Sequence, residues 1–354
     1  MRAVDDDLRE LLGDRGATDD EIERAEAEGW LPLLALDRVL VPGRPCYDID
    51  DLAAAAQTDV ATARALWRAL GFADVPPGLA VFTDDDATAL RLAVERVDDS
   101  SGGSTLERQV RALSAALARL AAVEAELIAE LVETTTGQGL DPATTARVVI
   151  DQFDWPTFAR LLDHVHRVQL RAALWRRLVR AVMGEGFLAV GFSDLAGYTE
   201  LSEHLDGRAL DALLSRFEEV AYDTVAEHGA RVVKTIGDEV MYVGLADQVV
   251  EAALDLDERV RRDEILPAVR TGLAAGPLLA RDGDYFGPVV NLASRLTEAA
   301  EPGAVLASVS LHDLLSDQPG LAWRLRRGQP VRGMEATDVY ELVRPAPETN
   351  GGES

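Results

Sequence analysis

Two patterns of apolar and polar positions divide the chain. Over residues 106–133, apolar side chains recur at spacings of three and four, which is typical of an amphipathic helix of about seven turns. From residue 187 onward the pattern changes to short apolar runs, such as 187–192 and 269–275, which indicate buried strands. The sequence therefore predicts a helical first half followed by a second half of mixed strands and helices.

Helix signals in the first half are local. Thr18 is expected to cap a helix over 18–28, because three acidic residues follow it and the positive end of the helix dipole favours acids. Two short helices are predicted within 48–70, and a longer helical tract over 141–182 with an interruption near Pro156. The Ser-Ser-Gly-Gly-Ser stretch at 100–104 is predicted to be a flexible joint.

The second half predicts a defined order of elements. A Gly-Asp turn between two apolar runs, centred on 237–238, indicates a β-hairpin. The remaining predicted elements are a strand at 187–192, helices at 199–228, 247–264 and 289–300, strands at 269–275 and 304–307, and short strands within 323–343. The order β-α-β-β-α-β with the hairpin in the middle is the ferredoxin-like arrangement. We therefore expect an α+β fold, with an all-α domain over 1–185, a ferredoxin-like domain over 186–344 and a disordered tail over 345–354.

Charge and cysteine content exclude several kinds of function. The formal net charge of −27 opposes contact with a phosphate backbone, so no nucleic-acid partner is expected, although 48–70 faintly resembles a helix-turn-helix. Cys46 is the sole cysteine, which excludes an intramolecular disulfide and a thiolate metal cluster. No apolar run approaches the roughly 18 residues that span a bilayer, and the N-terminus lacks an apolar signal core. We expect no membrane span and a cytoplasmic location.

Lys234 is the most informative single residue. It is the only lysine among the 35 basic Lys and Arg residues, and it stands just before the predicted hairpin turn. An ammonium is a compact charge with three rotatable donors, and a planar guanidinium does not replace it where geometry is tight. Compositional bias alone could also leave one lysine. The surrounding segment, Lys-Thr-Ile-Gly-Asp-Glu-Val, favours a functional role.

Two further segments carry polar groups at element ends. Asp194 follows the first predicted strand, and Asp238 lies at the hairpin tip, so two carboxylates at one edge of neighbouring strands form a plausible two-metal site. Asn291 and Arg295 are four residues apart on a predicted helix that begins at 287–288, and they project from the same face. An amide and a guanidinium that point together can stabilise a developing anion. Taken alone, each group could equally be an ordinary solvated side chain.

Together these segments resemble the catalytic domain of class III adenylate cyclases over about residues 185–343. The resemblance implies a role for each polar residue. It assigns metal binding to Asp194 and Asp238, adenine recognition to Lys234 and Asp284, ribose orientation to Asn291, and transition-state stabilisation to Arg295. Guanine carries an acceptor where adenine carries a donor, so ATP is the expected substrate.

The resemblance also implies a reaction and an assembly. The ribose 3′-oxygen of ATP would attack the α-phosphorus to form cyclic 3′,5′-AMP and pyrophosphate, assisted by two Mg²⁺ or Mn²⁺ ions per site. The family builds its sites between subunits, so we expect a head-to-tail homodimer with shared sites. A non-catalytic nucleotide-binding sensor with a cyclase fold remains an alternative. The segment 235–240 also has a partial likeness to diguanylate cyclases, but Lys234 and the Asn291–Arg295 face have no place in that family.

The helical half resembles, more loosely, the regulatory domain of actinobacterial cyclases that respond to acidity, and it ends in a linker helix. His164 and His166 lie close to the junction, and histidine changes charge near neutral pH. We hypothesise that their protonation alters the packing of the Arg-rich helix that follows, and with it the activity of a pH-sensing enzyme in signal transduction. A plain dimerisation platform is the alternative for this domain.

Overall fold

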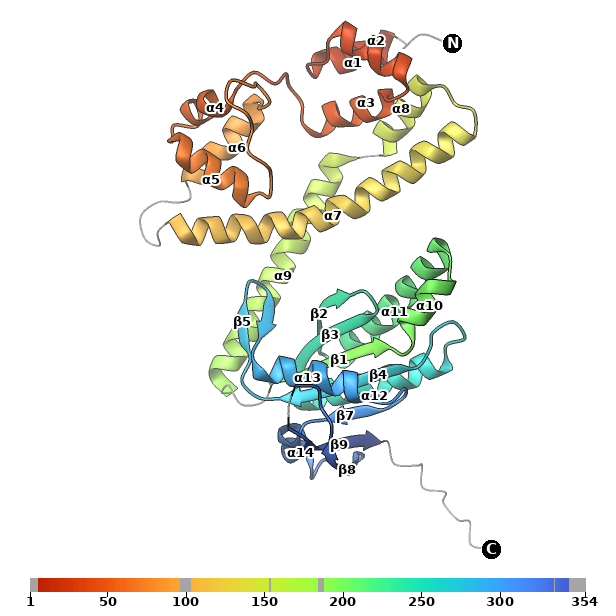
Figure 1. Cartoon of the computed structure of the whole chain (residues 1–354). Helices are drawn as coiled ribbons and strands as arrows, with labels where there is room; N and C mark the ends of the chain where they lie inside the picture. Colours follow the sequence, from red (N-terminus) through yellow and green to blue (C-terminus); the bar gives the residue numbers. More distant parts are fainter. Residues whose placement is uncertain (1–5, 96–102, 153, 184–187, 334, 344–354) are drawn as a thin grey trace, which may run out of the picture. The chain divides into compact units, whose positions relative to one another are not determined.

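The computed structural model describes residues 6–95, 103–152, 154–183, 188–333 and 335–343 (Figure 1). The chain forms two compact units, residues 1–171 and residues 172–354, and the division falls within one long helix. The tail predicted at 345–354 lies outside the described residues. In the described part, no helix is both long enough and apolar enough to span a membrane.

The first unit is helical throughout its named elements. Its helices are α1 (Asp6–Asp14), α2 (Asp19–Glu28), α3 (Leu31–Leu40), α4 (Ile49–Ala55), α5 (Val60–Ala69), α6 (Asp84–Glu95), α7 (Gly103–Gly137), α8 (Pro142–Gln152) and most of α9 (Trp155–Met183). Thr18 caps α2, as predicted from the acidic first turn, and it also forms a full capping box with Glu21. Asp48 and Asp59 cap α4 and α5, which are the two short helices predicted within 48–70.

Two small cores hold the first unit together. One buries apolar residues of α1, α2, α3 and α8, including Leu8, Ile22 and Leu31. The other buries residues of α4, α5 and α6 around Phe82. The helix-turn-helix-like segment is thus part of a packed core.

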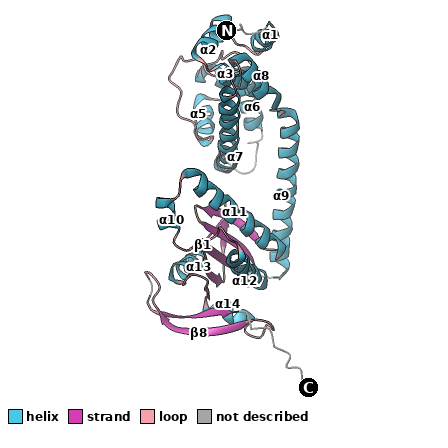
Figure 2. Cartoon of the chain, turned by 90° about the vertical axis from the view of Figure 1, so that its right-hand side faces the viewer, coloured by secondary structure: helices cyan, strands magenta, loops and turns pink. Residues whose placement is uncertain are grey.

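The second unit contains a seven-stranded sheet in the order β2-β3-β1-β4-β7-β9-β8 (Figure 1). Figure 2 shows strands of this unit in magenta and its helices in cyan. The strands are β1 (Leu188–Leu195), β2 (Arg231–Ile236), β3 (Glu239–Leu245), β4 (Val269–Ala275), β7 (Val305–Ala307), β8 (Ala322–Gln329) and β9 (Thr337–Val343). The first four in this order are antiparallel neighbours, and together with the intervening helices they form the predicted ferredoxin-like arrangement. The predicted α+β fold is confirmed.

Helices cover both faces of this sheet. On one face, α11 (Gly207–Glu227) and α12 (Ala246–Arg262) bury a large core around Phe217 and Tyr242. On the other face, α13 (Pro288–Ala299) packs on β1 and β4 through Ala293 and its neighbours. Gly272 permits this close approach, because a Cβ atom there would lie 2.3 Å from the backbone oxygen of Ala293 and the nitrogen of Thr297.

Several predicted boundaries were wrong. The single helix expected over 199–228 is two helices, α10 (Tyr198–His204) and α11, because the side chain of Asp206 accepts a hydrogen bond from the Ala209 amide and caps a new helix. The short hairpin β5 (Leu279–Arg281) and β6 (Asp284–Phe286) and the helix α14 (Val309–Leu315) were not predicted. The expected joint at 100–104 is helical from Gly103 onward, and its other residues are outside the described ranges.

Candidate active site

Three interior strands of the sheet each have one end at the candidate site. β1 runs antiparallel to both β3 and β4, so the end of β1 lies beside the beginnings of the other two strands. In the register of the sheet, Asp194 faces Glu239 on one side and Arg270 on the other. Asp194 is a residue of β1 itself and does not follow the strand, as had been expected. Asp238 occupies the turn just before β3, with the Gly237 backbone at φ 63°.

A network of buried hydroxyl groups lies close to this end of the three strands. The Ser193 hydroxyl lies 2.8 Å from the hydroxyl of Thr271 and 3.2 Å from that of Tyr242. These residues belong to β1, β4 and β3, so the network joins the three strands one residue before Asp194. Buried polar groups that satisfy one another specify a single arrangement, because each would be costly without its partner. The carboxylate of Asp194 is therefore placed by a rigid support.

Asp194 and Asp238 are brought together as predicted. Burial, and then the hydrogen bond and the charge of Asp194, raise the pKa of the Asp238 carboxyl to about 7. Burial and the charges of the same two aspartates also raise the pKa of Glu239 to about 7. Two carboxylates held close in a partly buried place repel each other when both are charged. Such a pair is suited to bind a cation.

Arg270 is the functional-site residue that sequence reasoning missed. Its guanidinium forms an ion pair with the Asp194 carboxylate, and its Nε atom is buried without a hydrogen-bond partner among the described residues. The sequence signal was available, since Arg270 is the one charged residue in the apolar strand β4. The guanidinium of Arg270 therefore lies next to the two carboxylates.

The donor set fits a divalent ion whose remaining ligands come from a bound polyphosphate. Asp194 and Asp238 offer the hard oxygen ligands that Mg²⁺ prefers, and Mg²⁺ is commonly held by one or two carboxylates together with phosphates. Within the described ranges, no group of three or more His, Cys, Asp or Glu side chains could hold a metal. The protein side of the site thus supplies few ligands.

Lys234 and Asp284 form a direct ion pair. The ammonium Nζ lies 2.5 Å from a carboxylate oxygen of Asp284, and the side chains are 38% and 27% exposed. The other carboxylate oxygen of Asp284 accepts a hydrogen bond of 2.7 Å from the Tyr285 amide. Lys234 follows an irregularity in the β2–β3 ladder, and Asp284 begins β6, so residues 50 positions apart meet on the same side of the fold. The pair remains open to a ligand.

Asn291 and Arg295 form a separate group on α13. Gly287, at φ 128°, precedes this helix, and Pro288 begins it. Asn291 is exposed, and the Arg295 guanidinium lies near Gly333, where an added Cβ would be 3.5 Å from Nη2. In the described part of one chain, no hydrogen bond or ion pair joins either residue to the carboxylate pair or to Lys234.

The two candidate regulatory histidines lie in the first unit. His164 and His166 are both exposed residues of α9. Residues two apart on a helix do not face each other, so the two imidazoles do not form one cluster. Their neighbours Asp163 and Arg167 form an ion pair one turn apart.

Comparison with known proteins identifies the family. Residues 185–344 match the model of the adenylate and guanylate cyclase catalytic domain. An uncharacterised protein of Mycobacterium tuberculosis is 36% identical, over 89% of this chain and 84% of its own length. An adenylate cyclase of Glutamicibacter nicotianae is 31% identical, over 87% of this chain and 81% of its own length. A pH-sensitive adenylate cyclase of M. tuberculosis is 29% identical, over 99% of this chain and 96% of its own length.

The chain belongs to the family of adenylate and guanylate cyclases. The similarity extends beyond the catalytic domain, because the relatives align over most of the chain, including its helical half. The predicted membership of the class III adenylate cyclases is confirmed.

Proposed function

We propose that the chain converts ATP into 3′,5′-cyclic AMP and pyrophosphate at sites shared between two subunits. The observation that carries the proposal is the Lys234–Asp284 ion pair. It places one strong donor and one strong acceptor side by side, in the same fold unit as the paired carboxylates of Asp194 and Asp238. Its half-exposed position leaves the pair accessible to a purine edge.

Lys234 and Asp284 would select adenine. The ammonium donates to a ring nitrogen, and the carboxylate accepts from the exocyclic amine. On guanine the corresponding edge presents an acceptor to Asp284, so two acceptors would face each other. Sites built on such pairs reject the mismatched ligand strongly, because their polar groups are left without partners.

Asp194 and Asp238 would hold two divalent ions, Mg²⁺ or Mn²⁺, against the triphosphate. Bound metal lowers the pKa of the attacking hydroxyl and neutralises phosphate charge. The chain itself contributes by positioning Asp194, because the hydrogen bonds of Ser193 hold β1 in place. Arg270 would leave Asp194 when a cation arrives, and its guanidinium would then lie at the same edge, ready to donate to phosphate oxygens.

Asn291 and Arg295, together with Lys234 and Asp284, would complete the site whose metal carboxylates, Asp194 and Asp238, belong to a twin subunit. Within one chain Asn291 and Arg295 make no described contact with the carboxylate pair, which supports a head-to-tail homodimer whose interface completes each site. Asn291 would orient the ribose by hydrogen bonding, and Arg295 would donate to the oxygens that gain charge as the 3′-oxygen attacks. Stabilisation of that developing charge lowers the barrier, because the donors are positioned before the reaction.

Complementation tests the shared sites. Asp194→Ala and Lys234→Ala proteins, each strongly impaired alone, should regain cyclic AMP synthesis when mixed, because a mixed dimer has one site in which the metal carboxylates and the purine pair are both intact. The assay measures cyclic AMP formed from Mn²⁺-ATP. Absence of recovery at every mixing ratio contradicts the shared-site model.

The rival function is a nucleotide sensor without catalysis. The same assay with unmodified protein distinguishes the two, because a sensor binds Mn²⁺-ATP and forms no cyclic AMP. Synthesis that requires Asp238 excludes the sensor, and binding without product favours it.

We also propose that residues 1–185 regulate residues 186–344. The pH-sensitive relative, which aligns over nearly the whole chain, supports a regulatory helical half. Comparing the rate of residues 186–354 with that of the full chain would give the sign of this regulation. Equal rates at every pH would instead indicate a dimerisation platform.

A further inference from the structure

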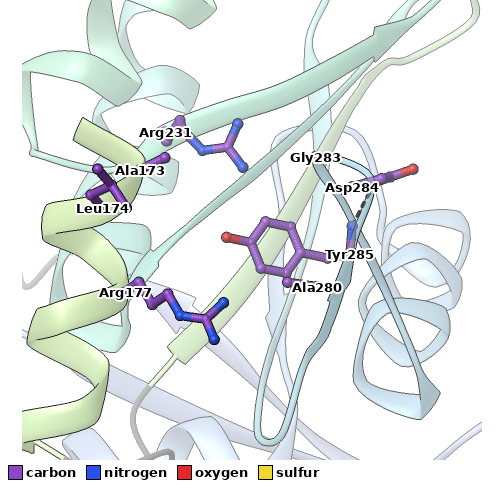
Figure 3. Close-up of a pocket in the computed structure, with 8 residues that line it drawn as sticks. All are labelled: Ala173, Leu174, Arg177, Arg231, Ala280, Gly283, Asp284 and Tyr285. Atoms are coloured by element: carbon purple, nitrogen blue, oxygen red, sulfur yellow. Dashed lines mark hydrogen bonds between the residues drawn. The ribbon is translucent and has the colours of Figure 1, made fainter. Parts of the chain in front are cut away.

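A cavity lies beside the Lys234–Asp284 pair. It has a volume of about 390 Å³ and is lined by residues of α9, β2 and the β5–β6 hairpin (Figure 3). All of its lining residues belong to the unit 172–354. In Figure 3 the Tyr285 ring points from the hairpin toward α9, while Arg177 from α9 and Arg231 from β2 extend into the same space. Cavities of this size typically accommodate small molecules.

Two arginines make this cavity cationic. Within the described residues, neither Arg177 nor Arg231 forms an ion pair. The Nε atom of Arg231 is buried without a hydrogen-bond partner, and its Cζ atom lies 5.7 Å from the centre of the Tyr285 ring. Most other described arginines of this acidic chain are paired with carboxylates. The only acidic lining residue, Asp284, already bonds to Lys234 and to the Tyr285 amide.

The rest of the lining is apolar. Ala173, Leu174 and Ala280 and the ring of Tyr285 provide surface for a non-polar ligand body. Guanidinium groups bind phosphate and carboxylate through paired hydrogen bonds, and a buried, unpaired donor is costly until a ligand satisfies it. We propose that this cavity is a binding site for a small organic anion, in which an apolar or aromatic group carries a phosphate or a carboxylate.

Occupation of this cavity would influence the nucleotide site. Asp284, a residue of the hairpin, lines the cavity and also holds Lys234, and its carboxylate accepts a hydrogen bond from the amide of the adjacent Tyr285. An anion held by Arg177 and Arg231 would also link α9 to β2. Its binding therefore stabilises one position of the hairpin and couples to ATP affinity, and the coupling must be reciprocal.

Calorimetric titration of the full chain with phenyl phosphate and with benzoate tests the proposal and separates the two head-group chemistries. Arg177→Gln and Arg231→Gln should each weaken binding at least about tenfold, because each removes a charged donor. Arg177 is exposed, so its replacement does not threaten folding. Arg281→Gln is the matched control, since Arg281 lies on the same hairpin but is paired with Asp282 outside the cavity.

The nucleotide site needs its own control, because it could also bind a phosphate. Arg270→Gln should leave binding of both probes unchanged. Failure of the unmodified protein to bind either probe at millimolar concentration overturns the proposal. Binding that survives both Arg177→Gln and Arg231→Gln, or that is lost in Arg270→Gln alone, also overturns it. The readout is binding, so it does not depend on whether the chain makes cyclic AMP.

Discussion

The two units differ in how they use their side chains. In the unit 172–354, strand ladders and one large core place polar groups at the sheet edge with fixed neighbours. In the unit 1–171, two small cores leave the long helices α7 and α9 with exposed apolar residues, such as Leu127 and Leu161. The hydrogen bonds between strands fix the position of each polar side chain at the site. Exposed apolar faces on long helices are instead suited to packing against another protein surface. Chemistry and regulation are accordingly expected to separate along this division.

The largest expected effect concerns the metal carboxylates. Asp194→Asn should lower cyclase activity by at least about a thousandfold, because it removes a metal-binding charge from the site. Asp163→Asn on α9, which loses only an exposed ion pair, should leave the rate within about twofold. Rates of cyclic AMP formation from Mn²⁺-ATP measure both. Similar losses of activity in the two variants would contradict the assignment of catalysis to the sheet unit alone.

Replacing a large side chain with Ala should lower the free energy of unfolding much more in the sheet unit than on an exposed helix face of the helical unit. Phe217→Ala removes a fully buried ring from the large core and should cost about 3–5 kcal/mol of unfolding free energy. Leu127→Ala, at a side chain 61% exposed on α7, should change it by less than about 0.5 kcal/mol. Urea unfolding of the full chain measures both values. A large cost at Leu127 would show that another surface covers α7 in solution.

The purine pair should matter less than the carboxylates. Lys234→Met should lower kcat/KM for ATP by about 10- to 100-fold, since a hydrogen bond to a charged group contributes about 1.5–3 kcal/mol. Asp19→Asn breaks a similar ion pair with Arg9 in the helical unit, at 2.7 Å, and should have no effect. Steady-state kinetics with ATP and GTP test the pair. An unchanged preference for ATP in Lys234→Met would contradict its assignment.

Between about pH 4 and about pH 7, the strongest proton linkage should come from the sheet unit. The pKa values of Asp238 and Glu239 are raised to about 7, so between about pH 4 and about pH 7 the folded metal-free protein binds more protons than the unfolded chain. Their stabilising contribution is complete below about pH 4 and is lost as pH rises through about 7. The melting temperature in a chelator should therefore fall over this range. Asp238→Asn should make that fall smaller, and an unchanged slope would count against the raised pKa.

The smallest expected effect belongs to the helical unit. If His164 and His166 contribute to pH sensing, replacing both with Ala should change the shape of the activity profile between about pH 5.5 and about pH 8. The change should be modest, because both side chains are exposed and point to different sides of α9. Activity measured across this range decides the matter, and a superimposable profile removes the hypothesis.

Local signals in the sequence predicted much of the fold. The strand β4 was predicted with its observed bounds, and the helix cap at Thr18 was predicted from adjacent residues. The break before α11 was missed because continuous helical spacing concealed the cap at Asp206. Arg270 was missed for a different reason, since its importance depends on strand register, which brings it beside Asp194 from 76 residues away. Residues whose meaning depends on long-range pairing are not identified by spacing alone.

Gly272 leaves no room for a side chain between β4 and α13. With no side chain at this position, the backbone of α13 rests directly on β4, and this contact sets how far Asn291 and Arg295 stand from the sheet. One methyl group there would have to push the helix outward, and with it the two polar groups that are proposed to act on a twin subunit. In the proposed homodimer, the alignment of the twin subunits would thus depend on the absence of a side chain at Gly272.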